Sequence, residues 1–481
     1  MQSFFRYTNI MITFIICFAL LVLAYFTYGK FVENIMQPDA DRKTPAYTMT
    51  DGVDYVPMPA WRMFMIQFLN IAGLGPIFGA IMGAKFGTSA YIWIVIGCIF
   101  AGATHDYVAG MLSLKHGGES LPDLIGRYLG KKTMNVVRVF SIVLMILVGV
   151  VFMSGPAGLL ENLTSIDSFT WTVIIFVYYL LASMLPIDKV IGKVYPLFAL
   201  ALIFMAVGIM FQLVMHWPSI PEVWDGVGNT HPNAENVPIF PMLFISIACG
   251  AISGFHATQS PMMARCMTNE KQGRPIFYGA MIVEGIVALI WAAAANYFFM
   301  QNGKDVSNAA IIVNDITKHW LGAIGAVVAV LGVIFAPITS GDTAFRSARL
   351  IVADMLKMPQ QKIKNRLIIC VPLFVVAAGI LWYSLADKQG FDIIWRYFAW
   401  SNQTLSVFTL WAMTVYLYNN KRKYTLVALI PALLMTMVTV LYILIAPEGF
   451  TLPYNIGLAI ATLCVLLVLG GVFYRIKKSN K

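Results

Sequence analysis

Four ionisable side chains lie inside long apolar stretches of this 481-residue chain. His105 and Asp106 are adjacent, whereas His256 and Glu284 each lie in a separate stretch. A charge is costly in hydrocarbon and usually functional there, and a histidine titrates near pH 6.5, so all four are candidates for proton coupling. Neighbouring helical positions point about 100° apart, so His105 and Asp106 cannot both face one partner. The alternatives are a structural hydrogen-bond network that ties two helices together at His105–Asp106, and pairing of Glu284 with a cation.

Two apolar stretches contain residues that interrupt a helix halfway along. The first reads Ala72-Gly73-Leu74-Gly75-Pro76, and the second reads Gly250-Ala251-Ile252-Ser253-Gly254. Glycine weakens a helix and proline removes a backbone donor, so both helices are predicted to break. In a membrane the freed backbone groups must line protein or a water-filled cavity, and half-helix amino ends attract carboxylates. The alternative is that these small residues only permit close helix packing.

Polar side chains gather after the second break. His256, Thr258 and Gln259 follow it directly, and Asn402 and Gln403 lie in a later apolar stretch. The side chains directly after the break, Ser260 included, either take part in solute or proton binding or satisfy the backbone groups that the break frees. Asn402 and Gln403 either bind the solute or form hydrogen bonds between helices. The predicted substrate-binding residues are Ala72, Gly73, Gly75, Pro76, Gly250, Ser253, Gly254, His256, Thr258, Gln259 and Asn402.

The composition indicates that these residues are positioned by membrane helices. Hydrophobic residues make up 59% of the chain and charged residues 12%, with a mean hydropathy of +0.75. Soluble proteins carry about 25% charged residues. The net charge of +10 resides in short loops between apolar stretches, so no nucleic-acid partner is predicted. The six cysteines are scattered without a CxxC pair, which indicates packing residues.

Thirteen apolar stretches reach the length of about 20 residues that a membrane span needs. The first is interpreted as an N-terminal transmembrane helix within residues 1–30, because no signal-peptide cleavage site follows it. The pattern predicts an all-α polytopic membrane protein that forms one integral membrane domain. The stretches are 10–28, 62–83, 89–114, 134–156, 169–186, 193–215, 238–262, 275–300, 320–342, 365–384, 391–418, 424–446 and 453–474.

Basic residues alternate between successive connections from the third stretch onward. They cluster in residues 115–132, 346–366 and 475–481, whereas 157–168 and 216–237 contain none. Lys and Arg mark the cytoplasmic side of a membrane protein. The C-terminus is therefore predicted to be cytoplasmic and the N-terminus outside, in the inner (cytoplasmic) membrane.

The two interrupted stretches are the second and the seventh, and this odd offset inverts their direction. Residues 62–215 and 238–418 can thus form two five-helix units related by inversion, as in secondary transporters. The last two stretches, within 424–474, lie outside this repeat. A pair of interrupted helices in corresponding places predicts a transporter binding site between them.

Several strings resemble the carbon starvation protein A (CstA) family. They are Asp51-Gly-Val-Asp-Tyr-Val-Pro57, Ile71-Ala-Gly-Leu-Gly-Pro-Ile-Phe-Gly79, Ala101-Gly-Ala-Thr-His-Asp106, Lys115-His-Gly-Gly-Glu-Ser-Leu121 and Phe255-His256. The match is densest over residues 50–130 and 245–350, and the chain resembles a short form of the family. The resemblance implies a LeuT fold within the amino acid–polyamine–organocation superfamily. It also implies uptake of peptides or pyruvate during nutrient limitation.

A possible sodium site lies at the end of the ninth stretch. In transporters of the implied fold the corresponding helix often gives hydroxyl oxygens to a sodium ion beside the first broken helix. Hard cations prefer oxygen ligands, which Thr339, Ser340, Asp342 and Thr343 offer. The alternative is that Asp342 pairs with Arg346, one turn further on.

These observations predict a secondary active transporter that imports a small carboxylate nutrient by alternating access, coupled to protons or sodium. Its expected partners are the solute and the lipid bilayer, and no cofactor is predicted. Two other functions stay open: a membrane-embedded enzyme that uses His105, Asp106 or His256 as acid or base, and a channel. The chain lacks the His-Glu-x-x-His and Gly-x-Ser-x-Gly strings and the Gly-x-x-x-x-Gly-Lys-Ser/Thr fingerprint of ATP-driven proteins.

Overall fold

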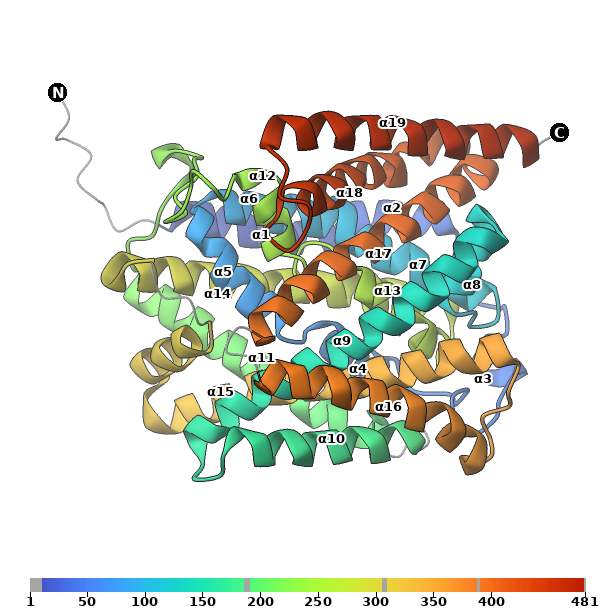
Figure 1. Ribbon diagram of the computed structural model, residues 1–481, viewed down its shortest axis with the longest axis horizontal. Helices are drawn as coiled ribbons and strands as arrows, with labels where there is room; N and C mark the ends of the chain where they lie inside the picture. Colours follow the sequence, from blue (N-terminus) through green and yellow to red (C-terminus); the bar gives the residue numbers. More distant parts are fainter. Residues whose placement is uncertain (1–10, 186–190, 305–308, 387–389, 480–481) are drawn as a thin grey trace.

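The computed structural model describes residues 11–185, 191–304, 309–386 and 390–479. These ranges are built from helices and loops without a strand, and most long helices run alongside one another (Figure 1). The predicted first span begins within residues 1–10, which lie outside the described ranges. The helices are α1 (Ile12–Phe26), α2 (Tyr28–Met36), α3 (Pro45–Thr48), α4 (Ala60–Ile71), α5 (Ala80–Gly83), α6 (Ser89–Ile96), α7 (Ala103–Lys115), α8 (Leu121–Leu129), α9 (Lys131–Leu163), α10 (Ser168–Met184), α11 (Ile191–His216), α12 (Ile239–Ser246), α13 (Gly254–Ala264), α14 (Ala280–Asn302), α15 (Ala309–Leu356), α16 (Ile363–Ala386), α17 (Gly390–Asn420), α18 (Leu426–Ile445) and α19 (Tyr454–Ser479).

The described helices confirm an all-α, multi-pass membrane protein. Eight of them are long and apolar enough to cross a membrane, and a bent pair would make a ninth. Each of the thirteen predicted stretches holds helical residues. Thirteen crossings and the inverted repeat stay predictions. The eight are Ile12–Met36, Ser89–Lys115, Lys131–Glu161, Tyr195–His216, Glu270–Asn302, Ile363–Ala386, Arg422–Ile445 and Tyr454–Lys478.

The first predicted helix break is confirmed. α4 ends at Ile71, and the helix resumes at Gly75 in a π-helical turn that leads into α5. The pieces Ala60–Ile71 and Gly75–Phe86 are bent by 54° relative to each other. Pro76 lies in the first turn of the second piece, where a helix does not need its missing N–H.

The second predicted break is confirmed as well. α12 ends at Ser246 and α13 begins at Gly254. Gly250 lies between them with φ of +91°, a left-handed conformation that side chains rarely adopt. The local chemistry of glycine therefore explains why this helix stops and restarts in the middle of an apolar stretch.

The connections predicted to share the cytoplasmic side contact one another. Arg475 Nε, near the C-terminus, donates to the carbonyl of Tyr128 at 3.2 Å, and Lys421 bonds to Gln37. At the opposite end, the Thr230 hydroxyl donates to the carbonyl of Lys85 at 2.9 Å. These contacts group the connections as the predicted alternation of basic residues does. The end that contains Tyr128 and Gln37 is assigned to the cytoplasm under Proposed function.

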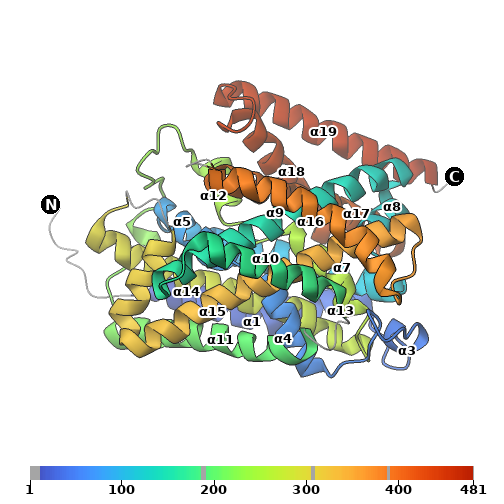
Figure 2. The same ribbon diagram turned by 60° about the horizontal axis from the view of Figure 1, so that its bottom comes forward.

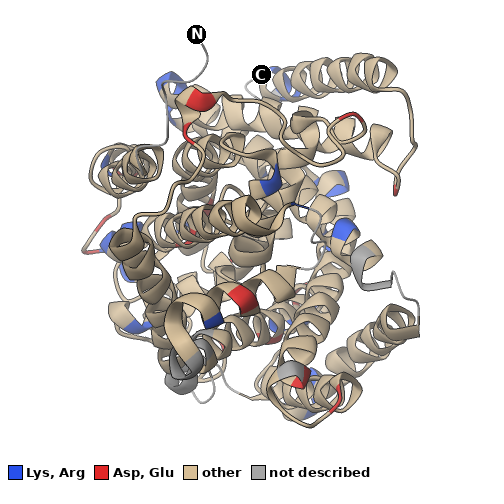
Figure 3. Cartoon of the chain, turned by 90° about the vertical axis from the view of Figure 1, so that its left-hand side faces the viewer, with Lys and Arg blue, Asp and Glu red and all other residues tan. Residues whose placement is uncertain are grey.

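The C-terminal helices α18 and α19 form the outer edge of the molecule, where α18 packs on α17 and α19 packs on α18 (Figures 1 and 2). The centre is made by α4, α7, α9, α13, α14 and α15, which contribute most of the fully buried polar side chains. Viewed along the helices, most of the chain is uncharged (Figure 3). The buried ionisable residues described next are therefore exceptions in an apolar interior.

Candidate solute and ion site at the two helix breaks

The two helix breaks pack directly against each other. A Cβ atom placed on Gly75 would lie 2.2 Å from the Cβ of Cys249, and one placed on Gly250 would lie 3.8 Å from the Cα of Pro76 and only 2.6 Å from the Cβ of Ala288 on α14. Real Cβ atoms do not approach so closely, so only glycine fits at these points. The breaks thus meet at one place, as two broken helices that share a site would require.

Asn402 of α17 caps the second half of the second broken helix. Its Oδ1 accepts hydrogen bonds from the backbone N–H of Phe255 at 2.7 Å and from the hydroxyl of Ser253 at 3.0 Å. The structure therefore brings Asn402 to the break and shows it forming hydrogen bonds between helices, one of them to a freed backbone donor. Its neighbour Gln403 donates instead to the carbonyl of Phe244 at 3.1 Å.

The four predicted proton-coupling residues form one contact chain across three helices. Asp106 Oδ2 of α7 lies 2.9 Å from His256 Nδ1 of α13. The other ring nitrogen of His256, Nε2, lies 3.4 Å from Glu284 Oε2 of α14. His105 Nδ1 turns back to Asp106 Oδ1 at 2.8 Å. All four side chains have 0% exposure.

This cluster places two acids and two imidazoles in contact inside the protein. Two carboxylates without a nearby positive charge would repel each other strongly there. A proton on His256 would balance a negative charge on both sides, since each ring nitrogen faces a carboxylate. The arrangement suits a group that gains and loses a proton while the helices around it move. His105 and Asp106 do not share a partner, as expected from the helical spacing.

Cys249 in the second break adds a thiol to the same cluster. Donor atoms of Cys249, His256 and Glu284 lie within 4.8 Å of one another, a spacing that one metal ion can span. Thiolate, imidazole and carboxylate are ligands that transition metals accept. A metal ion bound here would therefore compete with protons for Cys249, His256 and Glu284.

The remaining polar residues after the second break bond mostly within their own helix, α13. Thr258 Oγ1 donates to the carbonyl of Phe255 at 2.6 Å, and Gln259 Nε2 donates to Thr258 Oγ1 at 3.0 Å. Ser260 donates to the carbonyl of His256 at 3.1 Å. These carbonyls belong to α13 itself, so the two hydroxyls do not satisfy backbone groups that the break frees. Gln259 Oε1 keeps a buried acceptor without a partner among the described residues.

The hydroxyl-rich group on α15 contacts the first break through one residue. Ser340 Oγ donates to the carbonyl of Leu69 at 2.9 Å, at the end of α4. The hydroxyls of Thr339 and Thr343 bond to carbonyls of their own helix. Asp342 Oδ2 accepts from the hydroxyl of Tyr195 at 2.6 Å, which leaves Oδ1 without a described partner. Oxygen atoms for a cation are therefore present, and most already have partners.

Asp342 does not pair with Arg346, so that alternative prediction is wrong. Arg346 NH1 instead lies 3.5 Å from Asp54, and Arg349 NH2 lies 3.0 Å from the same carboxylate. Burial alone would raise the pKa of Asp54, but Arg349 and Arg346 outweigh it and hold that pKa below its ordinary value. The partner of Arg346 thus comes from a loop far away in the sequence.

Sequence reasoning missed several buried polar groups at the breaks. Besides Cys249 and Tyr195, Gln67 and Asn70 of α4 are fully buried just before the first break. None of the side-chain amide atoms of Gln67 and Asn70 has a hydrogen-bond partner in the described structure. The sequence does contain a signal that could have identified them. It is a pair of amide side chains, three residues apart in an apolar stretch and about one turn before a glycine-rich break.

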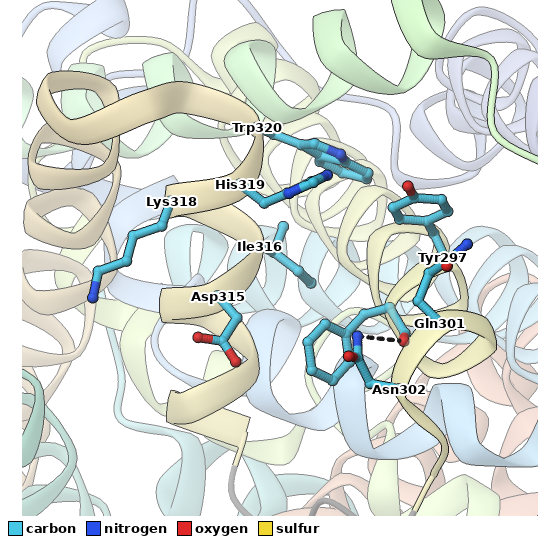
Figure 4. Close-up of a pocket in the computed structure, with 9 residues that line it drawn as sticks. Tyr297, Gln301, Asn302, Asp315, Ile316, Lys318, His319 and Trp320 are labelled. Atoms are coloured by element: carbon cyan, nitrogen blue, oxygen red, sulfur yellow. Dashed lines mark hydrogen bonds between the residues drawn. The ribbon is translucent and has the colours of Figure 1, made fainter.

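A separate pocket of about 560 Å³ lies away from the breaks (Figure 4). It is formed by the end of α14 and the first part of α15, where Tyr297 and Trp320 stack at 5.4 Å. Asp315, Lys318 and His319 also line it. None of the predicted site residues lines this pocket, and its charged lining residues Asp315 and Lys318 have exposed side chains.

Comparison with known proteins places most of the chain in one sequence family. The family model described as carbon starvation protein CstA matches residues 9–155, 156–323 and 304–442. The chain is 27% identical over 551 aligned positions to the peptide transporter CstA of Bacillus subtilis, covering 91% of this chain and 90% of that relative. It is 26% identical over 343 positions to the pyruvate/proton symporter BtsT of Escherichia coli, covering 57% of this chain and 47% of that relative.

Among solved structures, a mutant of the manganese transporter from Eremococcus coleocola resembles this chain with a TM-score of 0.52. The match covers 89% of this chain and 99% of the other, at 14% sequence identity. At such low identity the likeness shows a shared fold. The named sequence relatives are transporters as well, in line with the prediction that the chain is not an enzyme.

Proposed function

The chain belongs to the carbon starvation protein CstA family, and from this premise we propose that it is a secondary active transporter. It imports a small nutrient with a carboxylate, a short peptide or pyruvate, by alternating access. The named relatives, a peptide transporter and a pyruvate/proton symporter, support these two solute classes.

One observation carries this proposal: the two helix breaks meet at Gly75 and Cys249, beside a buried cluster of ionisable groups. Backbone N–H groups at the amino ends of the second half-helices, other than that of Phe255, which Asn402 caps, are suited to an anionic carboxylate. Because the breaks lie on separate elements, relative movement of these elements would open the site first to one side and then to the other.

Protons are the coupling ions that the geometry favours. His256 lies between Asp106 and Glu284, which come from different helices. A proton on His256 strengthens both contacts, and its release leaves two buried carboxylates that repel each other. Proton binding would therefore bias the position of α13 relative to α7 and α14. Sodium at the hydroxyl-rich α15 group is the other candidate, supported by the contact of Ser340 with the first break.

The proposed architecture follows from the two breaks. Residues 62–215 and 238–418 form inverted five-helix units, residues 1–30 add one helix before them, and 424–474 add two after them. The protein spans the inner (cytoplasmic) membrane, with the N-terminus outside and the C-terminus inside. The contacts among connections rich in basic residues support this orientation.

Uptake by reconstituted vesicles tests the proposal. Vesicles containing the purified protein are given labelled dialanine or pyruvate, with a proton gradient and a sodium gradient imposed in separate experiments. We expect accumulation driven by the proton gradient and saturating with solute concentration. Uptake of both solutes no faster than in empty vesicles, under either gradient, would refute the proposed function.

A further inference from the structure

Gln67 and Asn70 are the most conspicuous unpaired polar side chains near the breaks. Both have 0% exposure, yet both amide nitrogens and both amide oxygens lack hydrogen-bond partners within the described structure. Most buried polar groups in proteins are hydrogen-bonded, so four such atoms together call for an explanation. No contact within the described protein explains why these amides are retained here.

Their position on α4 points to the transport site. The two residues are three apart, so their side chains lie on one side of the helix, with Cβ atoms about 5–6 Å apart. α4 ends at Ile71, one residue after Asn70. The same helix packs against α13, α14 and α15, which hold His256, Glu284 and Ser340. The unpaired amides thus end the first half of the broken helix, next to the proposed site.

The chemistry of an amide side chain limits what can satisfy it. Each amide has two N–H donors and one carbonyl acceptor with two lone pairs. A ligand that only accepts hydrogen bonds would leave the two carbonyl oxygens unpaired. A peptide bond offers both an N–H and a C=O, so it complements a side-chain amide on both counts.

Resting on the proposed transport function, we propose that Gln67 and Asn70 form an amide subsite that binds the peptide bond of the solute. The carbonyl oxygen of either side chain accepts from the peptide N–H, and its NH₂ group donates to the peptide C=O. Ionised pyruvate contains acceptors only and lacks an N–H donor. The subsite therefore selects short peptides over keto acids, which narrows the solute class for this chain.

A pair of ligands that differ in one group tests this directly. In L-alanyl-L-lactate an ester oxygen replaces the peptide N–H of L-alanyl-L-alanine, and both ends stay the same. Calorimetric titration of the purified protein in detergent measures both affinities and that of pyruvate. We expect the dipeptide to bind about 5- to 150-fold more tightly than the ester, because the ester leaves a buried acceptor unpaired. Pyruvate should bind more weakly than the dipeptide.

Two variants of nearly equal shape locate the effect. Gln67→Met and Asn70→Leu remove the amides and should reduce the preference for dipeptide over ester toward equality. Folding should not suffer, because replacing an unpaired buried amide by an apolar group is neutral or stabilising. Melting temperatures that equal or exceed that of the natural protein verify this. Gln301→Met makes the same chemical change on the exposed wall of the separate pocket and should leave the preference unchanged.

The outcomes separate this inference from the proposed function. Equal binding of dipeptide and ester, no dipeptide binding, or an unchanged preference in both variants overturns the amide subsite, whatever the vesicles transport. Pyruvate uptake in vesicles together with absent dipeptide binding would uphold the proposed function and still overturn the subsite. Selective dipeptide binding without uptake of any solute would instead uphold the subsite and count against transport.

Discussion

Asp106 Oδ2 lies 2.9 Å from His256 Nδ1, and this contact joins α7 to the second half of the broken helix, α13. The partners are 150 residues apart in the sequence, and both side chains are fully buried. On its other side His256 faces Glu284. A change of protonation at one ring therefore acts on three helices at once, two of which do not belong to the break.

Replacing His256 by Ala should abolish the response of uptake to a proton gradient. The change leaves Asp106 and Glu284 without their shared partner, and removal of one member of a buried pair is costly. We expect the rate of gradient-driven uptake to fall about tenfold or more, equivalent to about 1.4 kcal/mol. Uptake by vesicles at several imposed pH differences measures this. His216→Ala, on an exposed histidine near the end of α11, is the control. Unchanged uptake kinetics in His256→Ala would exclude a coupling role.

Uptake should not depend on a metal ion bound at the cluster of Asp106, His256 and Glu284. Both ring nitrogens of His256 already face carboxylates, so the position suits a proton without further ligands. We expect that EDTA leaves proton-driven uptake unchanged, and that Cys249→Ser retains most of the activity. Uptake that is lost in EDTA and restored by manganese or zinc would instead assign Cys249, His256 and Glu284 as metal ligands.

The contact of the two breaks should not tolerate a side chain at Gly75. A Cβ there would lie 2.2 Å from the Cβ and 2.4 Å from the Sγ of Cys249. Overpacking of this kind costs about 1–3 kcal/mol, and Gly75→Leu should force the two breaks apart and stop uptake. Gly379→Leu on α16, where an added Cβ would meet no atom of another residue within 4 Å outside the backbone of its own helix, is the matched control. Normal uptake by Gly75→Leu would place the solute elsewhere.

A compensating change tests whether the clash itself causes the loss. Gly75→Ala should lower uptake, and the double variant Gly75→Ala with Cys249→Gly should recover part of it, because the clashing atoms of Cys249 are then gone. Uptake by the two variants in the same vesicles measures the recovery. A double variant no better than Gly75→Ala would show that the contact with Cys249 does not limit transport.

Both breaks could be predicted from the sequence because glycine and proline act on the backbone locally. The break between Ile71 and Gly75 lies within its predicted string, whereas the break between Ser246 and Gly254 begins before the predicted string and ends within it. Asn402 could be singled out as a polar side chain in an apolar stretch, but its place at the second break depends on how α17 packs on α13. Local patterns thus identified the elements of the site.

Contacts between distant residues could not be predicted in the same way. Asp342 was paired with Arg346 by helical spacing, but Tyr195 and Asp54 supply the partners, and neither lies near in the sequence. The mutual contacts of Asp106, His256 and Glu284 depend on how three helices pack. Gln67 and Asn70 were missed because an uncharged amide in an apolar helix usually bonds to a neighbouring helix.

Sodium dependence separates the two candidate coupling ions. Ser340 is the α15 hydroxyl that reaches the first break, and Thr339 is its neighbour. If protons alone drive the carrier, the double variant Thr339→Ala with Ser340→Ala should transport equally well with and without sodium, as the natural protein does. Vesicles prepared in sodium-free and sodium-containing buffers measure this. Sodium-stimulated uptake in the natural protein that disappears in the variant would assign the cation site to α15.

The ion pairs of Asp54 should stabilise one end of the molecule. Arg346 and Arg349 are fully buried, and both lie close to the Asp54 carboxylate. Asp54→Asn leaves two buried guanidinium groups short of a counter-charge and should lower the free energy of unfolding by about 3–5 kcal/mol. Asp41→Asn in the same connection, where the side chain is exposed, should change it little. The melting temperature in detergent measures both.

The pH dependence follows from the lowered pKa of Asp54. The folded state binds a proton here less readily than the unfolded state, so the contribution to stability is complete above the ordinary carboxyl pKa of about 4. It is lost as the pH falls through the lower pKa of the folded protein. The difference in melting temperature between the natural protein and Asp54→Asn should therefore be constant near neutral pH and shrink in acid. A difference that grows as the pH falls would show that the arginines do not stabilise the ionised carboxylate.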